Sequence, residues 1–231
     1  GFGAGVKTKR EVTPLEGLKN RLPSSVKINY AEGYLERYEE KNTGKLGDIT
    51  LNGPVTIDKL DDAKVQEAVE AAKNSDIAIV FAGSNRDYET EASDRRSLKL
   101  PFAQEELIKK VVEANPKTIL VMVAGAPFDI KDISTKINAL VWSWFNGSEG
   151  GNALADVILG NVNPSGKLPW TMPVDIKDSP AHATNSFPGD KTVEYKEGIL
   201  VGYRWFDTKK VEPLYPFGYG LSYTTFSFEK P

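Results

Sequence analysis

The sequence predicts an α/β fold, in which a mostly parallel sheet is sandwiched between helices ((α/β)6-sandwich type). The first observation is that short apolar runs alternate with amphipathic helical segments between residues 61 and 160. Such alternation is typical of buried parallel strands joined by helical crossovers. The second is that this alternation stops near residue 161, and a long wrap rich in Gly, Pro and aromatic residues follows. The third is that 231 residues, 40% of them hydrophobic, suffice to bury a substantial core.

The first element is a helix over residues 15–22. Thr13 and Pro14 form a good N-cap and N1 pair before it, and Pro23 ends it. A short strand is expected at 26–30. Residues 31–60 are polar and contain several glycines, which predicts a long surface excursion.

The central elements follow from periodicity and from continuous apolar runs. Helices are expected at 61–76, 102–116 and 148–160, and buried strands at 76–83, 118–125 and 137–144. Ser148 is expected to cap the last helix. Trp142 and Trp144, on the third strand, are expected to lie in the core. After residue 161 we expect long loops, with a few strands that finish one edge of the sheet.

Composition excludes several classes of protein. The 29 Lys and Arg residues balance 32 Asp and Glu residues, so an electrostatic nucleic-acid binder is not expected. The absence of cysteine excludes disulfides, thiolate metal sites and a cysteine nucleophile. With His182 as the single histidine, a site built from several imidazoles is excluded, and a surface role is expected for it. No apolar run reaches the length of about 20 residues that a membrane span needs, and nothing in the first residues reads as a signal peptide. The compartment stays open.

The predicted chemistry lies in the charged loop at 84–100. Parallel sheets bind ligands at the carboxyl ends of their strands, and this loop follows the first of them. A carboxyl group there can act as a general acid if its surroundings keep it protonated near neutral pH. The alternative is a solvated loop of surface ion pairs. The charged residues that we single out are Asp87, Glu89, Glu91, Asp94, Arg86, Arg95 and Arg96.

Two glycine-rich segments have competing interpretations. The loop FNGSEGG (145–151) could bind an anion at a helix start, but a tight turn is the simpler reading. The opening GFGAG resembles a dinucleotide turn only superficially, because no strand precedes it in the sequence.

Several segments together resemble one family. They are TPLEGLKNRL (13–22), ETEASDRRSLKLPFAQEELI (89–108), NPKTILVMVAGAP (115–127), NGSEGGNALADVILGNVNPSGKLPWTMP (146–173), YKEGILVGYRWFD (195–207) and PLYPFGYGLSYTTF (213–226). They are similar to the second, α/β-sandwich domain of family 3 glycoside hydrolases, the β-glucosidase and β-xylosidase group. The resemblance covers nearly the whole chain, 1–231, apart from residues 31–60.

The resemblance implies a retaining glycosidase with carboxyl groups from two domains. An Asp nucleophile belongs to a (β/α)₈-type barrel, and a Glu acid/base belongs to a loop of the sandwich domain. The family pattern Glu-Gly-x-Asp-Arg stands here as residues 91–95, with Ala92 in place of Gly. It implies Glu91 as the acid/base, with Glu89 as the substitute if the register slips by two. Asp94 and Arg95 are expected to brace the loop.

The opening glycines match a loop that in relatives approaches the sugar. Phe2, Gly3 and Ala4 are therefore substrate-binding candidates, although Ala4 replaces a common Ser and so lacks its hydroxyl. The resemblance further implies that this chain is a fragment without its first strand, that its partner is a barrel domain, and that it is inactive alone.

The expected substrate is an oligosaccharide or β-glucoside, cleaved at terminal β-D-glucosyl residues. No metal or organic cofactor is implied, and no nucleic acid or membrane partner. Two alternatives remain open from the sequence: a β-xylosidase of the same family, and a catalytically silent carbohydrate-binding or interaction module.

Overall fold

The computed structural model describes residues 7–40, 54–89, 94–95, 97–189 and 191–229. The chain divides into two compact units. The first contains Ser25–Asn146 and the second joins Thr8–Ser24 to Gly147–Pro231. Among the described residues, no helix is both long and apolar enough to cross a membrane.

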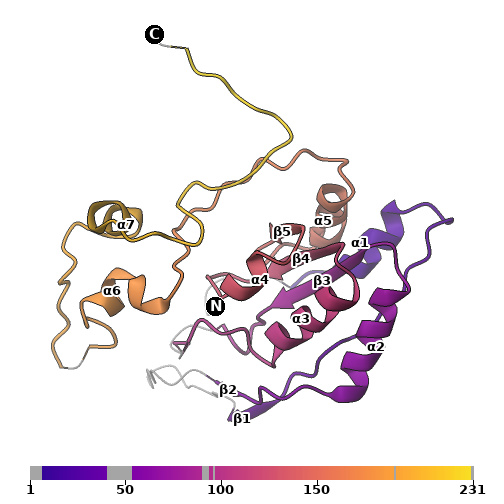
Figure 1. Cartoon of the computed structure of the whole chain (residues 1–231), viewed down its shortest axis with the longest axis horizontal. Helices are drawn as coiled ribbons and strands as arrows, with labels where there is room; N and C mark the ends of the chain where they lie inside the picture. The colour runs from indigo at the N-terminus through magenta and orange to yellow at the C-terminus, as the bar shows by residue number, and fades with distance from the viewer. Residues whose placement is uncertain (1–6, 41–53, 90–93, 96, 190, 230–231) are drawn as a thin grey trace. The chain divides into compact units, whose positions relative to one another are not determined.

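The first unit is built on a parallel sheet (Figure 1). Its strands are β3 (Ala78–Gly83), β4 (Thr118–Val123) and β5 (Ala139–Trp142), in the spatial order β3-β4-β5. The central strand β4 has Leu120 and Met122 fully buried, as expected for a strand with neighbours on both sides. The three predicted strands and their parallel arrangement are confirmed.

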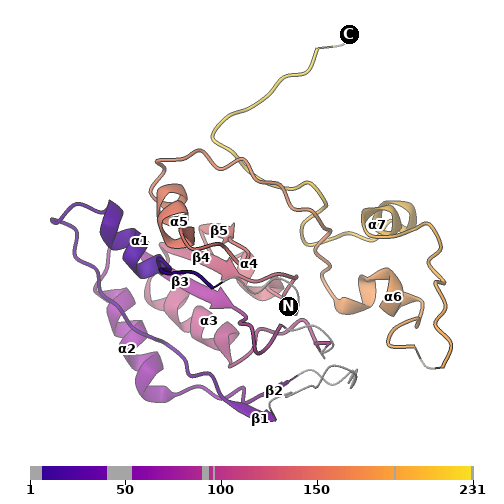
Figure 2. The same ribbon diagram turned by 180° about the vertical axis from the view of Figure 1, so that it is seen from behind.

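Helices α2 (Asp62–Lys73), α3 (Gln104–Ala114) and the short α4 (Lys131–Ser134) complete this α/β unit. Figures 1 and 2 show α2 and α3 side by side, and α3 also contacts β3. A cluster of buried apolar side chains joins the two helices to the sheet: Val65, Ala72, Ala78, Leu107 and Val111. The helices expected at 61–76 and 102–116 are therefore confirmed, and both bury apolar side chains.

One prediction for residues 26–60 is wrong, and another missed a feature. Residues 26–30 form no strand, because no described segment supplies the hydrogen-bonding partner that a strand needs. The supposed surface excursion contains an antiparallel pair, β1 (Tyr38–Glu40) and β2 (Val55–Thr56). The sequence did not indicate this antiparallel pair, because strands of three and two residues are too short to show a periodic pattern.

Aromatic rings beside this hairpin pack around Phe102. Its ring stacks on Tyr34 at a centroid distance of 5.9 Å and meets Tyr38 edge-on at 5.2 Å. Phe102 has a left-handed backbone (φ 61°), and its N–H donates to Asp58 Oδ1 at 2.8 Å. This contact and the ring packing stabilise a conformation that a bulky residue rarely adopts.

Burial of Tyr34 predicts a change in stability at alkaline pH. Desolvation raises the pKa of Tyr34 to about 12, whereas an unfolded tyrosine titrates near 10. The contribution of neutral, buried Tyr34 to the unfolding free energy is therefore complete below pH 10 and is lost as pH rises from about 10 to 12. The full loss amounts to about 2–3 kcal/mol. Urea unfolding at pH 8 and pH 11, compared with Tyr34→Phe, is expected to show about half of this loss, about 1–1.5 kcal/mol. Equal losses in both proteins would contradict the assignment.

The second unit pairs α1 (Pro14–Arg21) with α5 (Gly150–Ile158). The backbones approach so closely that a Cβ on Gly17 would lie 1.9 Å from the carbonyl oxygen of Gly151. Thr13 caps α1 through a capping box with Glu16, as the sequence predicted for the start of this helix. Glycine at both contact positions is therefore required for this packing.

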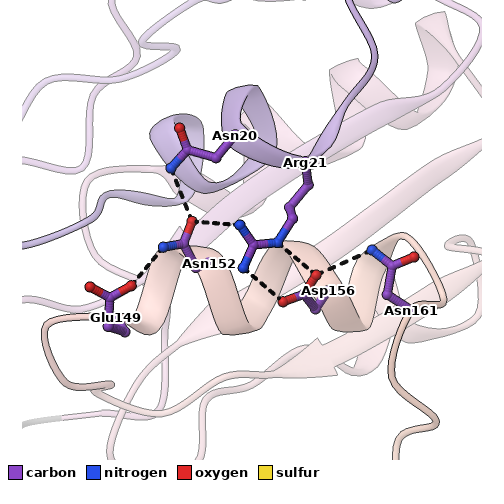
Figure 3. Close-up of polar contacts among 6 residues, drawn as sticks. All are labelled: Asn20, Arg21, Glu149, Asn152, Asp156 and Asn161. Atoms are coloured by element: carbon purple, nitrogen blue, oxygen red, sulfur yellow. Dashed lines mark hydrogen bonds and ion pairs between the residues drawn. The ribbon is translucent and has the colours of Figure 1, made fainter.

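Polar side chains line the same contact (Figure 3). Arg21 makes a two-pronged ion pair with Asp156, with Nε to Oδ1 at 2.8 Å and Nη2 to Oδ2 at 3.1 Å. Asn152 accepts from Asn20 and donates to Glu149. The Arg21 guanidinium holds the pKa of Asp156 below its usual range, so the ion pair persists at neutral pH and is lost only as pH falls through that lowered value.

Beyond residue 161 the second unit contains short helices rather than the expected strands. They are η1 (Ile176–Asp178), α6 (Pro180–Ala183) and α7 (Tyr203–Lys209). Within the described part of this segment, β structure is limited to an isolated bridge between Met172 and Tyr215. Pro180 at the first turn of α6 favours a helix there, which the count of Gly, Pro and aromatic residues could not reveal.

Candidate functional site

The loops after β3, β4 and β5 meet at the carboxyl edge of the sheet. Parallel register brings Gly83 opposite Val123 and Met122 opposite Trp142, so the three strands end together. Beyond the strands, Ser84 N–H donates to the Val123 carbonyl at 3.0 Å. The loop at 84–100 therefore starts where parallel sheets usually bind ligands.

Asn85 organises the start of this loop. Its Oδ1 accepts from the backbone N–H groups of Asp87 and Tyr88, at 3.0 and 2.9 Å. Its carbonyl accepts from Glu89 N–H at 2.9 Å, and its Oδ1 also accepts from the Tyr38 hydroxyl at 3.1 Å. This turn directs Tyr88 into the core and brings Glu89 beside the loop after β4.

Glu89 is fixed by two groups. One carboxylate oxygen, Oε2, accepts from Gly125 N–H at 3.0 Å, and the other, Oε1, lies 3.7 Å from Arg95 Nη1. The side chain is only 13% exposed. A Cβ on Gly125 would lie 3.1 Å from Glu89 Oε2, so the glycine provides the space for this approach.

Arg95 is held on the other side of the same loop. Its Nη2 donates to the Pro127 carbonyl at 3.0 Å, and its guanidinium carbon lies 4.5 Å from the centroid of the Phe128 ring. Burial lowers the pKa of Arg95, while Glu89 opposes that shift. The expectation of a solvated surface loop therefore does not describe this pair.

The other predicted residues fall into two groups. Glu91 lies outside the described residues, as do Phe2, Gly3, Ala4 and Arg96. Arg86, Asp87 and Asp94 are exposed, whereas the side chains of Glu89 and Arg95 are largely buried. The described residues contain no group of three or more Asp, Glu or His side chains placed to hold a metal ion.

The loop after β5 differs from its prediction in two respects. Trp142 and Trp144 are half-buried rather than core residues, because β5 packs against only one described neighbour, β4. Ser148 does not cap α5; Glu149 occupies the N-cap position without a side-chain cap bond. Within the second unit, Gly150 N–H closes a turn onto the Gly147 carbonyl at 2.8 Å, which fits the tight-turn interpretation.

His182 belongs to α6 in the second unit rather than to a loop. Its ring packs against Phe187 at a centroid distance of 5.2 Å. This packing agrees with a structural role for the only histidine of the chain.

Sequence reasoning missed a buried amide that joins the sheet to α3. Gln104 is 1% exposed, and its side chain both accepts from Gly83 N–H and donates to the Gly83 carbonyl, each at 2.8 Å. Gly83 is the last residue of β3, so this contact fixes the point where the loop begins. A glutamine at a helix start gives no sequence signal for such a role.

Comparison with known proteins gives a consistent result. The model of the glycosyl hydrolase family 3 C-terminal domain matches residues 1–223. Beta-glucosidase BoGH3A of Bacteroides ovatus is 43% identical over 236 aligned positions, which cover 100% of this chain and 30% of that protein. Thermostable beta-glucosidase B of Acetivibrio thermocellus is 45% identical over 92% of this chain and 25% of its own length.

Solved structures agree with these relatives. The Bifidobacterium adolescentis GH3 beta-glucosidase has a TM-score of 0.78 and 35% identity, over 94% of this chain and 29% of that one. The Thermotoga neapolitana beta-glucosidase 3B in complex with glucose has a TM-score of 0.72 and 29% identity, over 96% of this chain and 32% of that one. The chain thus spans less than a third of the length of these relatives. On the matched family model and these relatives, the chain belongs to the glycosyl hydrolase family 3 C-terminal domain family.

Proposed function

We propose that this chain supplies the proton-donating half of the active site of a retaining, exo-acting β-glucosidase. The enzyme would release terminal β-D-glucosyl residues from oligosaccharides or glucosides, with Glu91 as general acid and base. The observation that carries the proposal is the position of the loop around Glu91: both of its described ends, Glu89 and Arg95, lie at the carboxyl edge of a sheet in a chain whose relatives are named β-glucosidases. These names favour glucose over xylose as the substrate sugar.

The chemistry follows from two carboxyl groups in a retaining mechanism. In the first step, an Asp of the partner domain attacks the anomeric carbon while Glu91 gives its proton to the leaving oxygen. In the second step, the Glu91 carboxylate takes a proton from water, which attacks the anomeric carbon and releases the Asp. The two carboxyl groups must lie about 5–5.5 Å apart, so the site is complete only when both domains are present.

Glu89 is the second candidate for the acid/base, but its surroundings favour a different role. One of its oxygens accepts a backbone N–H and the other faces a buried guanidinium. Both oxygens are therefore directed at protein groups, whereas a general acid must present its proton to the leaving oxygen. Glu91 is therefore the residue to test first, and Glu89 is better suited to support it.

The partner is proposed to be a barrel domain that carries the Asp nucleophile. The relatives are more than three times as long as this chain, which leaves room for such a domain. The second unit also exposes several large apolar side chains, a feature of surfaces that contact other protein. They include Tyr195, Ile199, Leu221, Tyr223, Phe226 and Phe228. Phe2, Gly3 and Ala4 are proposed to approach the sugar.

The test removes one negative charge from this domain, in the full-length polypeptide that contains both this domain and the barrel. Glu91→Gln is expected to lose most of its turnover of 4-nitrophenyl β-D-glucoside, because acid/base assistance contributes about 10²–10⁴-fold. Glu113→Gln, an exposed glutamate at the end of α3, is the matched control and is expected to keep full turnover. Equal activity of the two variants would remove Glu91 from the role.

A further inference from the structure

We propose that Glu89 and Arg95 act together as a clasp that positions Glu91. The clasp consists of these two side chains and the backbone of residues 125–127, to which both side chains are hydrogen-bonded. Glu89 precedes Glu91 in the sequence, and Arg95 follows it. This inference rests on the proposed function, since it assigns the pair a role in aiming the acid/base. Both members are positioning residues and neither is proposed to touch the substrate.

The first half of the clasp is the Glu89 carboxylate. Its Oε2 accepts from Gly125 N–H at 3.0 Å, directly after the end of β4. Gly125 lies against two groups at once, because a Cβ there would be 3.1 Å from both Glu89 Oε2 and the Phe145 ring. The carboxylate is therefore located by a backbone group that belongs to the rigid edge of the sheet.

The second half is the Arg95 guanidinium. It donates through Nη2 to the Pro127 carbonyl at 3.0 Å and lies over the Phe128 ring at 4.5 Å. Phe128 is 1% exposed, and its ring also stacks with Tyr88 at a centroid distance of 6.3 Å. Arg95 is thus held against buried residues of the first unit and does not extend freely into solvent.

The two clasp residues carry opposite charges that face each other. The two side chains are only 13% and 15% exposed, and Glu89 Oε1 faces Arg95 Nη1 at 3.7 Å. Among the described residues, these two atoms are buried and make no hydrogen bond. A buried charge is costly without an opposite charge, so each residue is needed to keep the other in place.

The consequence for catalysis is geometric. Residues 89 and 95 are six positions apart, and Glu91 lies between them, two positions after Glu89. A proton donor must meet the leaving oxygen at hydrogen-bond distance, and a displacement of about 1 Å can cost about 10²-fold in rate. The clasp is proposed to act by fixing Glu89 and Arg95, the residues that precede and follow Glu91 in the sequence.

The experiment uses the polypeptide that joins this domain to its barrel. The variants are Glu89→Gln and Arg95→Met, with Arg37→Met as the matched control, because Arg37 forms an exposed ion pair with Asp61 in the same unit. The measurement is kcat/KM for two glucosides, one with a poor leaving group (phenol) and one with an activated leaving group (2,4-dinitrophenol). Arg95→Lys, which keeps the charge, is measured as well in case Arg95→Met does not fold.

The clasp predicts a selective loss. Glu89→Gln and Arg95→Met are expected to fall about 10–10²-fold on the phenyl glucoside and much less on the dinitrophenyl glucoside, which needs little protonation. Azide is expected to rescue neither, since Glu91 is still present. Arg95→Lys is expected to lie between Arg95→Met and the wild type, and Arg37→Met to match the wild type.

Three results would overturn the clasp. The first is wild-type kcat/KM on both glucosides for Glu89→Gln and for Arg95→Met, or for Arg95→Lys in its place if Arg95→Met does not fold. A second is an equal loss on both glucosides, the result of general damage to the fold. In either case a Glu91→Gln variant that still loses activity leaves the proposed function intact. The third is the combination of a Glu89→Gln variant that azide rescues and a Glu91→Gln variant that keeps full activity. This combination would make Glu89 the acid and overturn both proposals.

Discussion

Replacement of Glu91 by Gln is expected to lower kcat/KM for phenyl β-D-glucoside by about 10²–10⁴-fold, the usual contribution of a general acid. The same variant is expected to hydrolyse 2,4-dinitrophenyl β-D-glucoside with nearly unchanged kcat/KM. This constant reports the steps up to formation of the glycosyl-enzyme, in which only the leaving oxygen receives a proton. An activated phenolate leaves without that proton, so the loss of the acid affects only the poor leaving group.

The leaving-group series separates acid catalysis from other causes of inactivity. A variant with damaged folding or poor sugar binding loses activity on both substrates in proportion. Glu113→Gln, on the exposed end of α3, controls for the loss of one negative charge. A Glu91→Gln variant with parallel losses on both glucosides would show that Glu91 does not donate the proton.

Replacement of Gln104 by Leu is expected to reduce the unfolding free energy by about 2–5 kcal/mol. Gln104 is 1% exposed and satisfies both the N–H and the carbonyl of Gly83, each at 2.8 Å. Leucine has a similar size but no polar group, so two buried backbone groups lose their partner at about 1–3 kcal/mol each. Urea denaturation followed by circular dichroism measures the difference.

The matched control for this substitution is Gln66→Leu. Gln66 is an exposed glutamine of α2 in the same unit, and exposed substitutions usually stay within about 0.5 kcal/mol. Because Gly83 precedes the loop that carries the proposed site, Gln104→Leu is also expected to lower activity before the protein unfolds. Equal stability of the two variants would show that the Gly83 backbone finds other partners.

The sequence predicted the elements whose signals are local. Thr13 with Pro14 marks the start of α1, and the apolar runs mark β3 and β4. It could not predict elements that depend on distant partners. Residues 26–30 have strand-like composition but no pairing neighbour within the part of the chain that the structure describes. The short strands β1 and β2 exist because each supplies the other's partner.

The candidate site was predictable in part for the same reason. Carboxylates after a buried strand at the edge of a parallel sheet indicate a functional loop, and this loop begins at that edge. Which of them is buried depends on Gly125, Pro127 and Phe128, about 30 residues away in the sequence. The pairing of Glu89 with Arg95 is therefore a result of tertiary structure that no spacing rule supplies.

Azide rescue of Glu91→Gly tests the central claim most directly. Water attacks the glycosyl-enzyme only with help from a base, whereas azide is an anion that needs none and fits the space left by the missing carboxyl group. With dinitrophenyl β-D-glucoside, azide is expected to raise kcat of the variant and to yield β-glucosyl azide, while the wild type and Glu113→Gln do not respond. A variant whose turnover azide leaves unchanged, or one that forms the α-azide, would contradict the account.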